Sequence, residues 1–201
     1  MGVGELIDGF EAAQTLDELK LKFQCAIECY GFSAYNFFDA GNAHQLEPFY
    51  FGTTGEGWER EYKSNNFVLH DPTLSFARRT NVGFRWGEVP LPVQHGKKKP
   101  SALKLIEAAQ DHGFKEGYIF PYHFVDTQGR THSTLVALFW KDKASEIQSA
   151  LDVIRKHELN LIILYWIQRV LSVLAYKFKT RDNFSSVPND FSQLTFVIFS
   201  N

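Results

Sequence analysis

The sequence predicts an α+β fold, an α-β-α sandwich in which a central antiparallel sheet of about five strands is flanked by helices. Two patterns carry this prediction. Short segments rich in aromatic and β-branched residues follow one another across brief turns, as the strands of antiparallel hairpins do. Longer segments whose apolar residues recur every three or four positions surround them and indicate amphipathic helices. With 201 residues, 44% of them hydrophobic, the chain is long enough for one domain with a substantial core.

Local signals set the boundaries of these elements. Thr15 and Glu18 form a capping-box pattern, in which Thr15 bonds forward and Glu18 bonds back. Asp71 followed by Pro72 suits the N-cap and first position of another helix, and Ser101 is expected to cap a third. The first predicted elements are a short helix around 6–10, a helix over 15–31, and strands over 32–40 and 47–52 joined by a turn at 41–42. Helices from 54 or 55 and from 71 follow, then an extended stretch at 84–86, a loop over 87–100 and a helix over 101–113. The last are strands over 118–125 and 131–140, joined by a turn at 126–129, and one long helix over 144–178.

Composition narrows the function. Aromatic residues make up 15% of the chain, and such bulky side chains both fill cores and line apolar ligand pockets. The formal net charge is −2, and the only dense basic run is Lys97–Lys99, which we expect in an exposed turn. Direct DNA binding by this chain alone is therefore not expected, because nucleic-acid readers usually carry a strongly basic face.

The cysteines and the apolar segments indicate a compartment. Cys25 and Cys29 are the only cysteines, too few for a zinc site, and we expect two half-buried free thiols on one helix. The first five residues do not resemble a signal peptide. The apolar run over 159–173 is interrupted by Gln168 and Arg169, which favours a buried helix over a membrane span. A cytoplasmic location is the expectation.

A set of spaced residues points to a family. In chain order the set is Gly31-Phe32-Ser33 entering a strand, Trp58, Tyr62, Asp71-Pro72, Trp86, Gly113, Gly117 and Pro121. Over roughly residues 15–178 the chain resembles the autoinducer-binding domain of LuxR-type quorum-sensing transcriptional regulators. The resemblance implies an α-β-α sandwich that holds an N-acyl-homoserine lactone between sheet and helices, without a cofactor and without catalysis.

The resemblance also implies roles for individual residues. Trp58 would donate its indole N–H to the lactone carbonyl, and Asp71 would accept the amide N–H of the ligand. Tyr62 and Trp86 would form flat apolar walls around the head group. The remaining ligand-binding residues that it implies are Thr54, Asn36, Phe38, Thr73, Leu74, Leu105, Ala109, Phe114, Leu135 and Ala137.

Two positions depart from the family pattern. Thr54 stands where the family commonly has a Tyr that bonds the acyl carbonyl. Ala137 stands near the place where a Ser or Thr often helps, with Ser133 or Thr134 as possible substitutes. The carbonyl end of the ligand is therefore expected to be held differently. This leaves two alternatives, an unusual acyl or aryl lactone or a pocket that has lost its ligand.

The C-terminal end departs most from the family pattern. We expect residues 1–180 to form the autoinducer-binding domain and residues 181–201 to be a short tail, a remnant of the linker to an absent helix-turn-helix domain. The family pairs through the long helix, so the predicted partners are a second copy or a full-length LuxR-type regulator, with no membrane partner. Such a mixed dimer would act as a ligand-dependent inhibitor. Leu161, Ile162, Tyr165, Trp166 and Leu174 are the expected contact residues.

Other functions remain open at this point. An enzyme would use His123 and His132 on a hairpin, or His70 beside Asp71, with Ser133 or Cys25 as the nucleophile. No nucleophile elbow, phosphate loop or metalloprotease motif accompanies them, so structural histidines are the favoured interpretation. A sensor of the GAF or PAS kind, or a dimerisation module without a ligand, would use the same sheet and helices.

Overall fold

The computed structural model describes residues 1–39, 49–125, 129 and 131–179, without the side chains of 175–179. This part of the chain divides into two compact units. The helical unit comprises Met1–Ser33 and the chain from Ser145 through the last described helix. The sheet unit comprises Ala34–Ala144 and contains all five strands.

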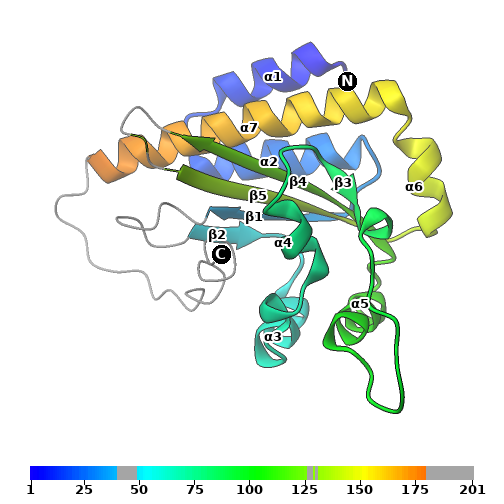
Figure 1. Cartoon of the computed structure of the whole chain (residues 1–201). Coiled ribbons are helices and arrows are strands. Elements are labelled where there is room, and N and C mark those ends of the chain that lie inside the picture. Colours follow the sequence, from blue (N-terminus) through cyan, green and yellow to red (C-terminus); the bar gives the residue numbers. More distant parts are fainter. Residues whose placement is uncertain (40–48, 126–128, 130, 180–201) are drawn as a thin grey trace. The chain divides into compact units, whose positions relative to one another are not determined.

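The helical unit contains α1 (Val3–Ala12), α2 (Leu16–Glu28), α6 (Ala144–Ala150) and α7 (Val153–Lys179). Trp166 of α7 is fully buried, stacks on Phe23 with the ring centroids 3.9 Å apart, and donates its indole N–H to the carbonyl of Leu19 at 3.0 Å. The Arg169 guanidinium donates to the carbonyls of Phe10, Glu11 and Ala13 at 3.3–3.4 Å, at the end of α1 where helix carbonyls lack partners. These contacts bind α1 and α2 to α7 (Figure 1).

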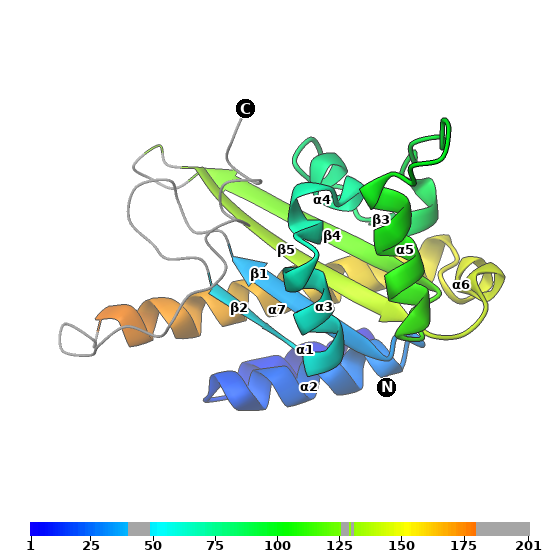
Figure 2. The same cartoon turned by 90° about the horizontal axis from the view of Figure 1, so that it is seen from below.

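The sheet unit contains β1 (Ala34–Asp39), β2 (Phe49–Gly52), β3 (Phe84–Arg85), β4 (Glu116–Val125) and β5 (Thr131–Trp140), ordered β2-β1-β5-β4-β3. Every neighbouring pair is antiparallel, which confirms the predicted sheet. The helices α3 (Glu56–Ser64), α4 (Pro72–Ala77) and α5 (Ser101–Asp111) gather on one face of it (Figure 2). Two 3-10 turns, Phe67–Leu69 and Trp86–Glu88, complete the unit.

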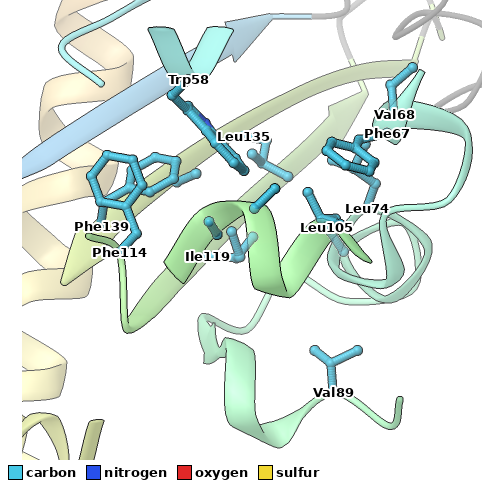
Figure 3. Packing of buried hydrophobic residues seen from close by; sticks show 14 of the residues in the cluster. Trp58, Phe67, Val68, Leu74, Val89, Leu105, Phe114, Ile119, Leu135 and Phe139 are labelled. Atoms are coloured by element: carbon cyan, nitrogen blue, oxygen red, sulfur yellow. The ribbon is translucent and has the colours of Figure 1, made fainter. Parts of the chain in front are cut away.

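Strand register selects the side chains that face these helices. Asn36 lies opposite Ala137, and Phe38 lies opposite Leu135, in the β1–β5 pair. Because side chains alternate between the two faces of a strand, these four residues share one face. Leu135 and Ala137 belong to a hydrophobic cluster in which Phe114 and Phe139 lie together beside Trp58 (Figure 3).

Several boundaries differ from the predictions. The long predicted helix is two helices, because the chain breaks at Leu151 and Asp152, and the Asp152 side chain accepts the Arg155 N–H as at the start of a new helix. Pro100, not Ser101, is the N-cap of α5. Trp86 begins a 3-10 turn and is not extended. The predicted turn at 41–42, residues 126–128 of the predicted turn at 126–129, and the tail from 181 lie outside the described residues.

The capping predictions hold in part. Thr15 accepts the N–H of Glu18 as expected, whereas the Glu18 carboxylate bonds the N–H of Gln14, one residue earlier than a capping box places it. Cys25 and Cys29 are free but exposed, not half-buried. Among the described residues, no helix has the length and apolar character needed to cross a bilayer.

Candidate ligand-binding site

A cavity lies inside the sheet unit, between the sheet and α3, α4 and α5. The centres of water molecules can occupy about 100 Å³ of it, several times the ~10–15 Å³ that one water needs. Most of its wall is apolar. The lining residues are Asn36, Phe38, Tyr50, Trp58, Glu59, Tyr62, Lys63, Asp71, Thr73, Leu74, Trp86, Leu105, Ile106, Ala109, Ile119, Leu135, Ala137 and Phe139.

Small residues of the sheet and of α5 line this space. Ala137 sits in the sheet between Asn36 and Ile119, its partners on the two neighbouring strands, and Ala109 belongs to α5. A larger side chain at either alanine would extend into the cavity. The volume therefore follows from the identity of two residues as well as from the fold.

Asp71 is the most heavily bonded polar group of the cavity. One carboxylate oxygen accepts the backbone N–H of Thr73 at 2.8 Å and the Thr73 hydroxyl at 2.6 Å, and the other accepts the Tyr62 hydroxyl at 2.8 Å. Burial raises the pKa of Asp71, and the hydrogen bonds from Thr73 and Tyr62 oppose that rise. The predicted N-cap role is confirmed, because the Thr73 N–H belongs to the first turn of α4.

Tyr62 donates a hydrogen bond from its hydroxyl to Asp71. Burial, and then the adjacent negative charge of Asp71, raise the pKa of Tyr62 well above its ordinary value. The phenol therefore stays protonated and remains a donor to the carboxylate. Its ring also packs against Trp58, with centroids 5.6 Å apart, so one residue joins the polar and aromatic parts of the wall.

Trp58 is held by rings on several sides. Phe114, Phe139 and His112 meet its indole edge to face at centroid distances of 5.9, 6.4 and 5.6 Å. His112 is in turn hydrogen-bonded to Glu61 at 2.8 Å, which links α5 to α3. In the part of the chain that the structure describes, the Trp58 indole N–H has no hydrogen-bond acceptor. Trp58 is thus a cavity-lining residue whose ring is held in place by its neighbours.

Trp86 forms an apolar wall, as predicted. Its indole lies over Gly117, where a Cβ would come within 2.4 Å of the indole nitrogen, and it meets Phe139 at 5.4 Å and 88°. The buried Glu116 carboxylate accepts the N–H groups of Gly87 and Gly117, which fixes the turn that carries Trp86. The indole nitrogen is buried and has no hydrogen-bond partner among the described atoms.

The sequence comparison identifies this arrangement. A family model described as the autoinducer binding domain matches residues 15–170. The chain belongs to this family. It therefore carries the signal-binding domain of LuxR-type, quorum-sensing regulators.

A sequence relative of this autoinducer-binding domain is consistent with the family match. RpaR of Rhodopseudomonas palustris, an HTH-type quorum sensing-dependent transcriptional regulator, is 28% identical over 126 residues, which cover 61% of this chain and 49% of RpaR. The chain thus spans about half the length of that curated relative.

Solved structures share the fold. SdiA of Escherichia coli matches with a TM-score of 0.62 at 15% identity, over 93% of this chain and 71% of SdiA. CepR2 of Burkholderia cenocepacia, an N-acylhomoserine lactone-dependent LuxR family transcription factor, matches with a TM-score of 0.59 at 14% identity, over 88% of this chain and 96% of CepR2. SdiA has also been solved in complex with octanoyl-rac-glycerol.

The structure brings twelve of the fourteen predicted ligand-binding residues to the wall of one cavity. Thr54 and Phe114 are the exceptions. The Thr54 hydroxyl bonds the Asn36 side chain at 3.0 Å, and Phe114 supports Trp58 without lining the space. Whether the lining residues bind the signal remains a prediction.

Six lining residues were not predicted. Phe139 follows Leu135 and Ala137 with the strand period of two, and Ile119 faces Ala137 across the ladder, so strand pairing would have indicated both. Glu59, Lys63 and Ile106 directly follow predicted helical residues. Tyr50 lies opposite Phe38, a pairing that depends on a hairpin register the sequence does not specify.

The structure explains one pair from the enzyme hypothesis. His123 bonds the Ser133 hydroxyl at 2.8 Å through Nδ1 and the carbonyl of Ala77 at 2.9 Å through Nε2. A carbonyl only accepts, so Nε2 carries the proton. The adjoining cavity of about 10 Å³ has room for about one water. The pair ties α4 to the β4–β5 hairpin of this signal-binding domain.

Proposed function

We propose that the chain is a quorum-sensing receptor that binds an N-acyl- or N-aryl-homoserine lactone in the cavity of the sheet unit. One observation carries the proposal: Asp71, an acceptor, and Trp58, whose indole N–H has no protein acceptor among the described residues, line the same apolar space. A lactone with an amide and an acyl or aryl chain complements these groups. The amide N–H would bond Asp71, the lactone carbonyl would accept from Trp58, and the chain would lie against the apolar wall.

The energetics favour such a ligand. A hydrogen bond to a charged group in a closed site contributes about 1.5–3 kcal/mol, and the apolar wall adds the burial of the chain. A bound ligand would also stabilise the charged form of Asp71. Burial disfavours this charged form, and each additional hydrogen-bond donor favours it. Binding an N–H should therefore lower the pKa of Asp71.

Titration calorimetry on the 201-residue chain tests the proposal. The panel contains butanoyl-, octanoyl-, dodecanoyl- and benzoyl-homoserine lactone, with unacylated homoserine lactone and octanoylglycerol as competitors of different chemistry. We expect at least one acylated lactone to bind more tightly than both competitors. Stronger binding of octanoylglycerol would indicate a sensor of another ligand class, and the absence of any binding would leave a dimerisation module.

We also infer that the chain acts in the cytoplasm and pairs with a second copy or with a full-length LuxR-type regulator. The contact residues predicted from sequence need correction, because Ile162, Trp166 and Leu174 are buried within the chain. Leu161 is 50% exposed, and Val153 and Ile154 of the same helix are exposed as well, so these side chains are the better candidates.

Light scattering and a reporter strain test the pairing. Wild-type protein should form dimers, and Leu161→Lys should shift the population toward monomers while the far-UV circular dichroism stays unchanged. Co-expression of these 201 residues with a full-length regulator should lower its transcriptional output in the presence of lactone. Unchanged output together with no recovered mixed dimer would contradict the inhibitor hypothesis.

A further inference from the structure

The helix α3 has few side chains that anchor it by burial. Of its nine residues, all within the described part of the chain, only Trp58 is buried. The helix begins after Gly55, which has a φ of +90° and no side chain that could cap it. Tertiary packing supplies most of the stability of a helix, so a helix that buries one ring depends on hydrogen bonds for its placement.

Some hydrogen bonds of α3 belong to the cavity wall. Tyr62 donates to Asp71 at 2.8 Å. Glu59 accepts from Tyr50 at 3.3 Å. All four residues line the cavity, so a substitution at any of them would change the cavity wall and the placement of α3 together.

Another hydrogen bond joins α3 to α5. His112, the C-cap residue of α5, bonds Glu61 at 2.8 Å through Nε2. A carboxylate only accepts, so Nε2 carries the proton. Neither residue is among those that line the cavity of the described chain. A substitution at either one therefore leaves the identity of every cavity-lining side chain unchanged.

The same imidazole packs against Trp58. The two rings lie edge to face, with centroids 5.6 Å apart and an interplanar angle of 67°. Gly57 leaves room for this contact, because a Cβ at that position would come within 3.3 Å of the His112 ring. The His112 side chain is 28% exposed, so burial alone does not fix it. An N–H···O bond is directional, so the bond to Glu61 sets the orientation of the ring that Trp58 meets.

We propose that His112, held by Glu61, is a positioning residue that keeps the Trp58 ring in its ligand-binding orientation. This inference rests on the proposed lactone binding through Trp58. The pair acts from outside the cavity and limits the movement of the Trp58 ring before a ligand arrives. Because immobilising a free side chain on binding weakens affinity, a ring that is ordered beforehand binds its ligand more tightly.

Titration calorimetry with the tightest-binding lactone of the four-member panel tests the pair. His112→Ala should weaken binding about two- to tenfold, the effect expected when one side chain must be ordered on binding. Glu61→Ala should weaken it to a similar degree, whereas Glu61→Gln keeps an acceptor oxygen for the imidazole and should retain most of the affinity.

Glu107→Ala is the matched control. Glu107 is a carboxylate of α5 that pairs with Lys99 and does not line the cavity, so this variant should bind lactone as the wild type does. Far-UV circular dichroism and melting without ligand check that each variant folds.

Two readouts separate positioning from a general structural effect. In a Trp58→Phe background, His112→Ala should have little further effect on affinity, as coupled residues require. In a ¹⁵N–¹H correlation spectrum each tryptophan indole gives its own signal, and Trp58→Phe identifies the signal of Trp58. His112→Ala should shift or broaden this signal in the ligand-free chain, whereas Glu107→Ala should leave it unchanged.

The outcomes are distinguishable. If His112→Ala binds lactone as the wild type does while Trp58→Phe loses affinity, positioning by His112 is wrong and the proposed function stands. If His112→Ala weakens binding equally in the wild-type and Trp58→Phe backgrounds, the imidazole does not act through Trp58, which also overturns the inference. If no panel member binds the wild-type chain, the proposed function itself fails and the inference fails with it.

Discussion

Of the three buried tryptophans among the described residues, Trp58, Trp140 and Trp166, the first and the last have opposite surroundings and belong to different units. Trp166 of the helical unit is fully buried, stacked on Phe23, and its indole N–H is bonded to the Leu19 carbonyl. Trp58 of the sheet unit is 5% exposed and edged by aromatic rings, yet it borders a cavity and its N–H has no acceptor among the described residues. The same side chain completes a core in one unit and leaves a polar group for a ligand in the other.

The difference shows how a binding site can be distinguished from a core. Buried polar groups in a finished core are paired, since an unpaired donor costs about 1–3 kcal/mol. Around the cavity, polar groups are fixed in position by neighbours but retain capacity for another partner. The contrast predicts that substitutions in the helical unit change stability, whereas matched substitutions in the sheet unit change ligand affinity.

The largest expected effect is on stability in the helical unit. Trp166→Ala removes a fully buried ring and leaves the Leu19 carbonyl without its donor, so we expect the free energy of unfolding to fall by about 3–5 kcal/mol. Trp58→Ala should cost less, because part of its surface already faces the cavity. Urea denaturation of both variants measures the difference, and an equal loss would contradict the contrast.

A milder, matched pair separates affinity from stability. Trp58→Phe keeps a ring and removes the N–H, so lactone binding should weaken by about 1–3 kcal/mol with a smaller change in unfolding. Trp166→Phe makes the same chemical change in the helical unit, where it should lower stability and leave the affinity of the folded chain unaltered. Calorimetric titration of the two variants provides the measurement. Equal affinities in both would mean that Trp58 is structural.

A smaller effect concerns pH. The pKa of Asp71 is raised in the folded chain, so between about pH 4, where unfolded Asp titrates, and the folded pKa, the folded state binds more protons than the unfolded state. Its contribution to stability is therefore present at low pH and lost as the pH rises through the folded pKa. The Asp71→Asn variant has no group that titrates at this position, so it does not lose this stability as the pH rises. It retains the N-cap, because Asn caps nearly as well as Asp.

Urea denaturation from pH 4 to 8 checks the sign. The stability of Asp71→Asn relative to wild type should rise with pH and then level off, while its lactone affinity stays below that of wild type by about 1–3 kcal/mol. A constant stability difference across this range would show that Asp71 titrates alike in both states.

Much of the fold could be predicted because it depends on local patterns. Asp71-Pro72 begins a helix and Thr15 caps one for reasons contained in a few neighbouring residues. The break at Leu151 and Asp152 was missed because apolar periodicity continues across it, although Asp152 itself is a suitable cap. The 3-10 turn at Trp86 depends on Glu116, which is distant in sequence.

The site residues likewise divide into those that the sequence could locate and those that depend on distant contacts. Family resemblance located Trp58, Tyr62 and Asp71, which the structure brings to one cavity. It assigned Thr54 to the ligand by position alone, whereas the Thr54 hydroxyl bonds Asn36. Tyr50 could not be found, because its place depends on the pairing of β2 with β1, a nonlocal contact.

The most direct test of the central claim is the melting temperature of wild type and Trp58→Phe across concentrations of the panel lactones. A ligand at about 100 times its dissociation constant stabilises the folded state by about 2.7 kcal/mol, which for a chain of this size raises the melting temperature by about 5–10 °C. We predict such a concentration-dependent rise for at least one lactone in the wild-type chain and a clearly smaller rise in Trp58→Phe. No rise with any lactone, or the same rise in both proteins, would contradict a receptor whose cavity binds its signal through Trp58.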